Sequence, residues 1–281
     1  MRVLLTVLLS FSFLFAAPFH IVTSFYPLQI MAINVAKDIP SVSVENLTPP
    51  LTGCLHDFSL TPKQLQSLSR ASVLVVNGLG MESFLDKVIR LYPKLPIIVL
   101  TQGLPVLISD GQPNPHVWLS VPLAKRMVDH LSDQLGQLDA IHRDNYKRNA
   151  ILYEGQLQAL DVWMKKELSP YHGISVITFH DAFPYFAKEY GFNVAGVIER
   201  EAGSEPSAKD RVGLRKKIVD EKVRVVFAEP QYSDKIARSI IRGSTTQLAE
   251  LDPGVTGPVK DSAYLDMMRH NIESIRKALK P

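Results

Sequence analysis

The sequence predicts an α/β protein with two lobes, each a parallel sheet flanked by helices, joined by one long rigid helix. Short β-branched runs alternate with amphipathic segments over residues 21–100 and again over 174–279, a pattern typical of parallel sheets covered by helices. Residues 123–168 lie between these regions and have helical spacing without proline. The chain of 281 residues, 46% hydrophobic and 21% charged, is long enough for two cores.

Residues 1–17 have the features of a signal peptide. Arg2 supplies a positive charge, residues 3–15 form an apolar run, and Ala16-Ala17 supplies small residues at its end. Because Phe15 stands where a small residue is expected before cleavage, an uncleaved membrane anchor is the alternative. No later stretch is apolar for long enough to span a membrane, so we expect an exported, periplasmic protein.

The first lobe is expected over residues 18–121. Short runs rich in β-branched residues predict buried strands at 21–25, 41–47, 73–77 and 97–100. Apolar residues at helical spacing predict helices at 28–37, 62–69 and 81–91.

Residues 122–168 are predicted to form the connection. Their apolar positions fit either one very long helix or two stacked helices with a break near Gly136. A single helix of about 40 residues would be roughly 60 Å long, which is more than one small domain needs. This stretch is therefore the candidate for a rod that joins the lobes.

The second lobe is expected over residues 169–281, with no detectable sequence repeat of the first. Ser204 and Ser207 are candidate caps for the helix that follows them. Strands are predicted at 174–179, 192–198, 223–228 and 246–251, and helices at 182–190, 207–221, 233–242 and 263–279.

Four side chains are candidate metal ligands, because each is predicted to follow a strand at the carboxyl edge of its sheet, where open parallel sheets bind ligands. Two come from each half of the chain, and we expect them to converge in a cleft: His56, His116, His180 and Asp252. Pro113 and Pro115 stiffen the loop that presents His116. Three imidazoles and a carboxylate suit Zn(II), whereas a Mn(II) site would carry more oxygen donors.

Several other polar residues are given structural or surface roles. Asp57 and Asp181 each follow a candidate histidine and could hold its second ring nitrogen. The acidic residues of the second lobe are expected to be solvated charges that balance nearby bases: Glu201, Glu205 and Glu229, near Arg200, Lys209 and Arg211. The remaining histidines are expected to be ordinary loop or helix residues: His20, His130, His142, His172 and His270.

The cysteine content and the charge exclude two classes of function. The single cysteine, Cys54, excludes an internal disulfide framework and Cys-rich zinc motifs, and it is expected to be a small buried thiol, with metal contact as the alternative. A formal charge of +3 without a long basic run gives no support for nucleic-acid binding.

Seven short motifs, taken in order, resemble the zinc/manganese solute-binding proteins of ABC importers over nearly the whole mature chain. They are Gly53-Cys54-Leu55-His56-Asp57-Phe58-Ser59-Leu60-Thr61-Pro62, Asn77-Gly78-Leu79-Gly80-Met81-Glu82, Asn114-Pro115-His116-Val117-Trp118-Leu119, Phe179-His180-Asp181-Ala182-Phe183, Glu205-Pro206-Ser207, Phe227-Ala228-Glu229-Pro230-Gln231 and Leu251-Asp252-Pro253.

The resemblance implies a ligand set and a partner. It assigns the nitrogen ligands to His56, His116 and His180, and the carboxylate to Asp252. Manganese members tend to carry a glutamate at the third position, so His180 favours Zn(II) as the transported ion, with Mn(II) as the alternative. The implied partner is the membrane permease, and we expect a monomer in which the linking helix limits hinge motion.

The sequence departs from the family pattern in three places, one of which is Cys54, two residues before the candidate ligand His56. Residues 101–113 are short and lack the His-rich loop of many zinc-specific members, and Leu55 stands where some members carry an acidic residue. Outside this family, the alternatives are a secreted zinc hydrolase, with Asp252 or Glu229 as general base, and a metal-dependent adhesin or sensor. No His-Glu-x-x-His or Gly-x-Ser-x-Gly motif supports the hydrolase.

Overall fold

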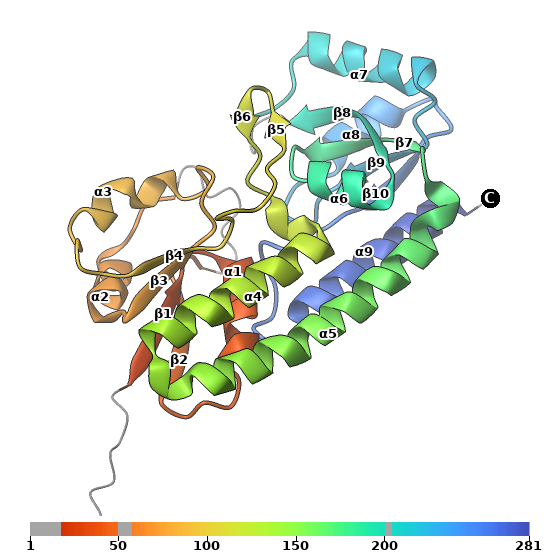
Figure 1. The fold of residues 1–281 in the computed structure, drawn as a ribbon. Coiled ribbons are helices and arrows are strands. Elements are labelled where there is room, and N and C mark those ends of the chain that lie inside the picture. The colour runs from red at the N-terminus through yellow and green to blue at the C-terminus, as the bar shows by residue number, and fades with distance from the viewer. Residues whose placement is uncertain (1–17, 50–57, 200–203, 281) are drawn as a thin grey trace, which may run out of the picture.

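The computed structural model describes residues 18–49, 58–199 and 204–280. Two lobes are visible, each built on a four-stranded parallel sheet, with long helices that run beside both (Figure 1). The predicted fold class is thus confirmed. The predicted signal peptide lies outside the described residues, and none of the helices within them combines the length and apolar character that a membrane span needs.

The first lobe has a parallel sheet in the order β2-β1-β3-β4. Its strands are β1 (Phe19–Thr23), β2 (Val42–Asn46), β3 (Val73–Val76) and β4 (Ile97–Val99). All four residues of β3 are buried, as expected for an interior strand covered on both faces. The helices of this lobe are α1 (Tyr26–Val35), α2 (Pro62–Arg70) and α3 (Asp86–Ile89).

The helix predicted at residues 81–91 is shorter than expected, consisting of a 3-10 turn at Ser83–Leu85 and the single turn α3. The chain before it closes a loop around Glu82, whose carboxylate accepts hydrogen bonds from the backbone N–H groups of Asn77 at 2.7 Å and Gly78 at 3.0 Å. Positive φ angles at Gly78, Leu79 and Gly80 lie outside the right-handed helical region, so no helix can run through this loop.

The second lobe has a parallel sheet in the order β10-β9-β7-β8. Its strands are β7 (Ser175–His180), β8 (Asn193–Glu199), β9 (Val225–Ala228) and β10 (Gln247–Glu250). The helices are α6 (Pro184–Tyr190), α7 (Ala208–Asp220), α8 (Lys235–Ile241) and α9 (Ala263–Leu279). Ser207 caps α7 as predicted, since its side chain accepts the backbone N–H of Asp210.

The two sheets share one topology. When the strands of each lobe are numbered in chain order, both sheets have the order 2-1-3-4, so the order reverses between β1 and β3 in one lobe and between β7 and β9 in the other. Ligands of open α/β sheets bind in the crevice at such a reversal. This repeat was invisible in the sequence.

The middle of the chain forms two helices, which is the second of the two predicted alternatives. Helix α4 (Val121–Leu138) packs antiparallel against α5 (Arg143–Leu168), and Lys147 of α5 reaches Asp129 of α4 at 2.7 Å. With 3-10 turns at both ends, α5 runs from the first lobe to the second and is the long connecting helix (Figure 1).

Helix α9 is a second connection between the lobes. It begins near α1 in the first lobe, where Asn34 donates to the carbonyl of Asp261 at 2.9 Å, and ends beside β10, where Ser274 donates to the carbonyl of Glu250 at 2.7 Å. It lies alongside α5 (Figure 1). One hydrophobic cluster runs through both lobes and these helices, from Ile21 to Leu279.

Candidate metal site

The structure brings His116 and His180 together between the lobes. The antiparallel pair β5 (Ile108–Ser109) and β6 (Gln112–Pro113) leads to His116, which precedes a 3-10 turn, while His180 is the last residue of β7. The centroids of the two imidazole rings are 4.9 Å apart, and the ring planes meet at 81°. Two of the predicted ligands therefore face each other.

His116 is held by its neighbours in the same loop. The side-chain oxygen of Asn114 accepts the backbone N–H of His116 at 3.0 Å and lies 3.1 Å from Nδ1 of the ring. Trp118, fully buried, packs against the imidazole with ring centroids 5.2 Å apart. Asn77, at the end of β3, donates to the carbonyl of Pro115 at 3.0 Å. These contacts fix the loop to the first sheet.

His180 has a buried carboxylate beside its ring. Oε1 of Glu229 lies 3.8 Å from Nδ1 of His180, and Glu229 follows β9, the strand next to β7. Glu229 is only 3% exposed, and its burial, followed by the charge of Asp252, raises its pKa to about 8. Asp252 thus lies close enough to Glu229 for their charges to interact.

Asp252 sits in a tightly bonded turn after β10. Its backbone N–H and C=O are both paired with the side chain of Asn271, at 2.8 Å each. The carboxylate accepts the N–H of Gly254 at 2.8 Å and the amide of Gln231 at 3.2 Å. Gly254 has φ of +69°, a conformation that favours glycine, and this lets its N–H turn back to the carboxylate. Burial raises the pKa of Asp252.

One hydrogen bond ties the His116 loop to the Asp252 loop. Nε1 of Trp118 donates to the carbonyl of Pro253 at 2.9 Å, and the hydroxyl of Tyr264 donates to the carbonyl of Trp118 at 2.7 Å. The three described candidates are therefore positioned by contacts that cross between the lobes.

His56 lies outside the described residues, as do Cys54 and Asp57, so the predicted four-ligand set is described only in part. Within residues 18–49, 58–199 and 204–280, no group of three or more His, Cys, Asp and Glu side chains is arranged to hold a metal ion. His116 and His180 form the pair that the structure brings together.

Two residues at this site were not identified from the sequence. Glu229 is buried beside His180, so the expectation of a solvated charge is wrong; Glu205, in contrast, is exposed and lies 3.4 Å from Arg211, as expected. Asn114 was noted only as part of a motif. Both residues could have been identified from their positions in the sequence. Glu229 follows a buried strand, and Asn114 precedes a candidate histidine by two residues.

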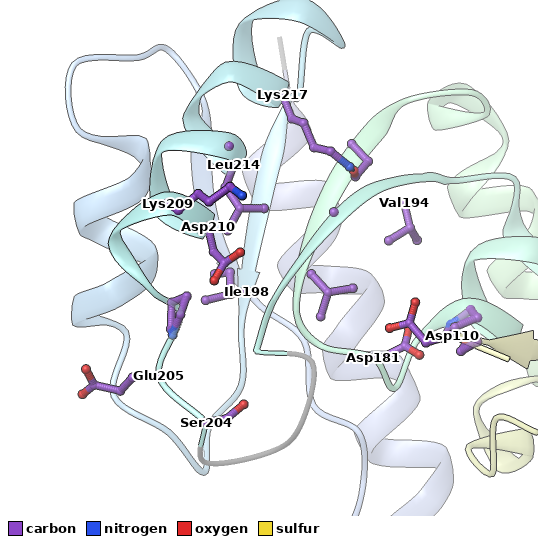
Figure 2. Close-up of a pocket in the computed structure, with 17 residues that line it drawn as sticks. Asp110, Asp181, Val194, Ile198, Ser204, Glu205, Lys209, Asp210, Leu214 and Lys217 are labelled. Atoms are coloured by element: carbon purple, nitrogen blue, oxygen red, sulfur yellow. The ribbon is translucent and has the colours of Figure 1, made fainter. Parts of the chain in front are cut away.

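Two cavities lie near the site. One of about 270 Å³ adjoins Asp252 and is lined by Tyr26 of α1 and Tyr264 of α9. A larger one of about 680 Å³ lies on the second lobe between α7 and β8 (Figure 2). None of the candidate ligands within the described residues lines the larger cavity, but Asp181 stands at its edge.

The sequence was compared with known protein families. Residues 21–278 match the family ZnuA, the periplasmic component A of a zinc-uptake complex. The chain belongs to this family. The predicted resemblance to metal-binding solute-binding proteins is thereby confirmed.

The relatives of this ZnuA-family chain carry names that refer to several metals. Manganese-binding lipoprotein MntA of Bacillus subtilis (strain 168) is 30% identical over 242 residues, which cover 80% of this chain and 79% of that protein. Iron-binding protein YfeA of Yersinia pestis is 28% identical, covering 93% and 86%. High-affinity zinc uptake system protein ZnuA of B. subtilis is 25% identical, covering 92% and 87%.

Solved structures have the same fold. A crystal structure of ZnuA superposes with a TM-score of 0.79 at 27% identity, covering 92% of this chain and 98% of that one. The solute-binding protein FpvC of Pseudomonas aeruginosa, in complex with Mn²⁺, gives 0.85 at 25% identity and covers 93% and 98%.

Proposed function

We propose that this protein captures a divalent transition metal ion, zinc in preference to manganese, in the cleft between its lobes and delivers it to the membrane permease of an ABC importer. The main support is the pair His116 and His180, whose rings lie 4.9 Å apart. Nδ1 of His116 lies 3.1 Å from the side-chain oxygen of Asn114, and Nδ1 of His180 lies 3.8 Å from Oε1 of Glu229. This arrangement favours Nε2 of each ring as the metal-binding atom.

The proposed ligand set is His56, His116, His180 and Asp252. Membership of the ZnuA family supports a metal site in this chain, and the motifs that resemble the family point to these four residues. Three imidazoles and one carboxylate favour zinc by their chemistry. The name of the MntA relative keeps manganese as the alternative cargo. The proposal includes export to the periplasm, action as a monomer, and binding and release without a chemical step.

The test is a competitive metal titration of the chelator-stripped mature protein with Zn(II) and Mn(II), for the wild type and His180→Ala. We expect one equivalent of zinc to bind more tightly than manganese, with a large loss of zinc affinity in the variant. His172→Ala is the matched control, because His172 is an exposed histidine of the same lobe and should leave affinity unchanged. Tighter binding of manganese, or wild-type zinc affinity in His180→Ala, would refute the zinc assignment.

A further inference from the structure

Asn114 contacts both lobes at the candidate site and is 3% exposed. We infer that Asn114 is a positioning residue that fixes the tautomer of His116 for metal binding and ties that histidine to the loop of His180. This inference rests on the proposed function for its consequence in metal affinity, but its structural part concerns the metal-free protein.

The orientation of the Asn114 amide is set by its nitrogen. Nδ2 faces three oxygen atoms and donates to the carbonyl of Asp181 at 2.8 Å, to Oδ2 of Asp181 at 3.1 Å and to Oγ of Ser109 at 3.2 Å. A carbonyl can only accept a hydrogen bond, so the opposite orientation would place the amide oxygen against acceptors. The amide oxygen must therefore point toward His116.

The amide oxygen in turn selects the tautomer of His116. It already accepts the backbone N–H of that residue, and it lies 3.1 Å from Nδ1. Because an amide oxygen has no proton to give, Nδ1 of His116 must carry the proton and donate it. The neutral imidazole then has its lone pair on Nε2, the form that binds a metal ion.

The same side chain connects the loops that carry the two histidines. Asp181 directly follows His180, and Asn114 is two residues before His116, so one amide joins both ligand loops across the lobes. The backbone of Asn114 is held independently, since the hydroxyl of Tyr185 donates to its carbonyl at 2.8 Å and accepts the N–H of Leu107 at 3.0 Å. The position of the amide is therefore fixed before metal arrives, and the ordering cost at binding is reduced.

Asp181 also faces a different environment on its other side. It lines the larger cavity together with Asp110 of the β5–β6 connection (Figure 2). Asn114 therefore connects Asp181, which lines this cavity, with His116.

The experiment compares Asn114→Ala and Asn114→Asp with the wild type. The tautomer of His116 is measured by ¹⁵N NMR of the imidazole nitrogens in metal-free protein, and zinc affinity by chelator competition. Asn114→Ala removes the acceptor, so we expect His116 to lose the fixed Nδ1–H form and zinc affinity to fall about 10- to 100-fold, the range for groups that orient metal-bound histidines. Asn114→Asp keeps an acceptor toward His116 and should keep the Nδ1–H tautomer, but its second carboxylate oxygen cannot donate to Asp181, so the tie to the loop of His180 is lost.

The matched control is Asn149→Ala. Asn149 of α5 also donates to two backbone carbonyls, those of Val35 and Lys37, but away from the histidines. Its loss should leave both the His116 tautomer and zinc affinity unchanged.

The inference is overturned by a fixed Nδ1–H tautomer or wild-type zinc affinity in Asn114→Ala, or by a mixed tautomer in Asn114→Asp. If Asn114→Ala does not fold, the tautomer in Asn114→Asp decides. Failure of the proposed function would look different: wild-type protein would bind no zinc, while the tautomer of the metal-free protein would still report on Asn114.

Discussion

At the scale of single residues, the two candidate histidines that the structure describes have partners of different chemistry. Nδ1 of His116 faces the neutral amide of Asn114, whereas Nδ1 of His180 faces the carboxylate of Glu229. A carboxylate behind an imidazole makes the ring a stronger electron donor toward a metal than an amide does. Oε1 of Glu229 is buried and has no hydrogen-bond partner within the described residues.

Substitution Glu229→Gln tests this difference. The glutamine keeps the volume but cannot ionise. Above the raised pKa of about 8, where Glu229 carries a charge behind His180, zinc affinity should therefore fall about 10- to 100-fold. Affinity is measured by competition with a chelator at a fixed pH above that value. Glu189→Gln serves as the control, because Glu189 of α6 pairs with Lys165 of α5 at 2.7 Å and lies outside the candidate site. Equal affinities for Glu229→Gln and wild type would show that the carboxylate does not act on His180.

Asn271 offers a second residue-scale prediction. It is fully buried on α9 and satisfies both backbone groups of Asp252. Asn271→Ala leaves the part-buried N–H and C=O of Asp252 without their partner, so the free energy of unfolding should fall by about 1–3 kcal/mol. Urea denaturation of the metal-free protein measures this change. The half-buried Asn149, replaced by alanine, should cost less; an equal or larger cost would contradict the importance assigned to Asn271.

The candidate ligands could be predicted from the sequence, but their partners could not. His180 ends a strand of buried β-branched and aromatic residues, so the local pattern places it at a strand end. Asp252 follows the short strand β10, which is only partly buried, and its position is less clearly marked. Glu229 has the same kind of position, yet a glutamate is usually solvated, and only the neighbouring strand β7 supplies the histidine that explains its burial. The role of Asn114 depends on Asp181, which is far away in the sequence.

At the scale of elements, the turn between α4 and α5 decides whether the middle of the chain is a rod or a hairpin. The apolar spacing continues through residues 138–146, so periodicity alone leaves both forms open. The break is made by polar contacts: Oδ2 of Asp139 accepts from the hydroxyl of Tyr146 at 2.8 Å and lies 2.6 Å from Nδ1 of His142. Arg143 donates to the carbonyl of Gly136 and closes the turn.

Asp139→Ala should weaken this turn without changing the site. Asp139 is 9% exposed, and its loss leaves the buried hydroxyl of Tyr146 unpaired, so we expect about 2–3 kcal/mol less stability in thermal or urea unfolding. Zinc affinity should match the wild type, because the turn lies at the far end of α4 from His116. Reduced affinity in the folded variant would mean that the hairpin contributes to the site after all.

At the scale of the whole molecule, the lobes are joined by more than one element. Helices α5 and α9 both run between them, and a single hydrophobic cluster includes residues of both lobes. Polar contacts add to this connection, such as Trp118 with Pro253 and Tyr26 with Pro258. A hinge requires a few residues that absorb a rotation, and two parallel connections with a shared core oppose one. The sequence predicted only one connecting helix. That α9 is a second one could not be predicted, because it depends on α9 beginning beside α1 of the first lobe.

The lobes should therefore move little when zinc binds. Spin labels at Lys94→Cys and Lys216→Cys, in a Cys54→Ser background, place one label on each lobe at exposed positions. We expect the distance between the labels to change by less than about 2 Å when zinc is added, because domain rearrangements on binding exceed about that distance. Trp118→Phe is the comparison, because it keeps an aromatic ring but removes the hydrogen bond to Pro253, and it should broaden the distance distribution in metal-free protein. A zinc-induced shift of several ångströms in the wild type would show that α5 and α9 bend, and capture would then depend on lobe closure instead of on the loops that carry His116, His180 and Asp252.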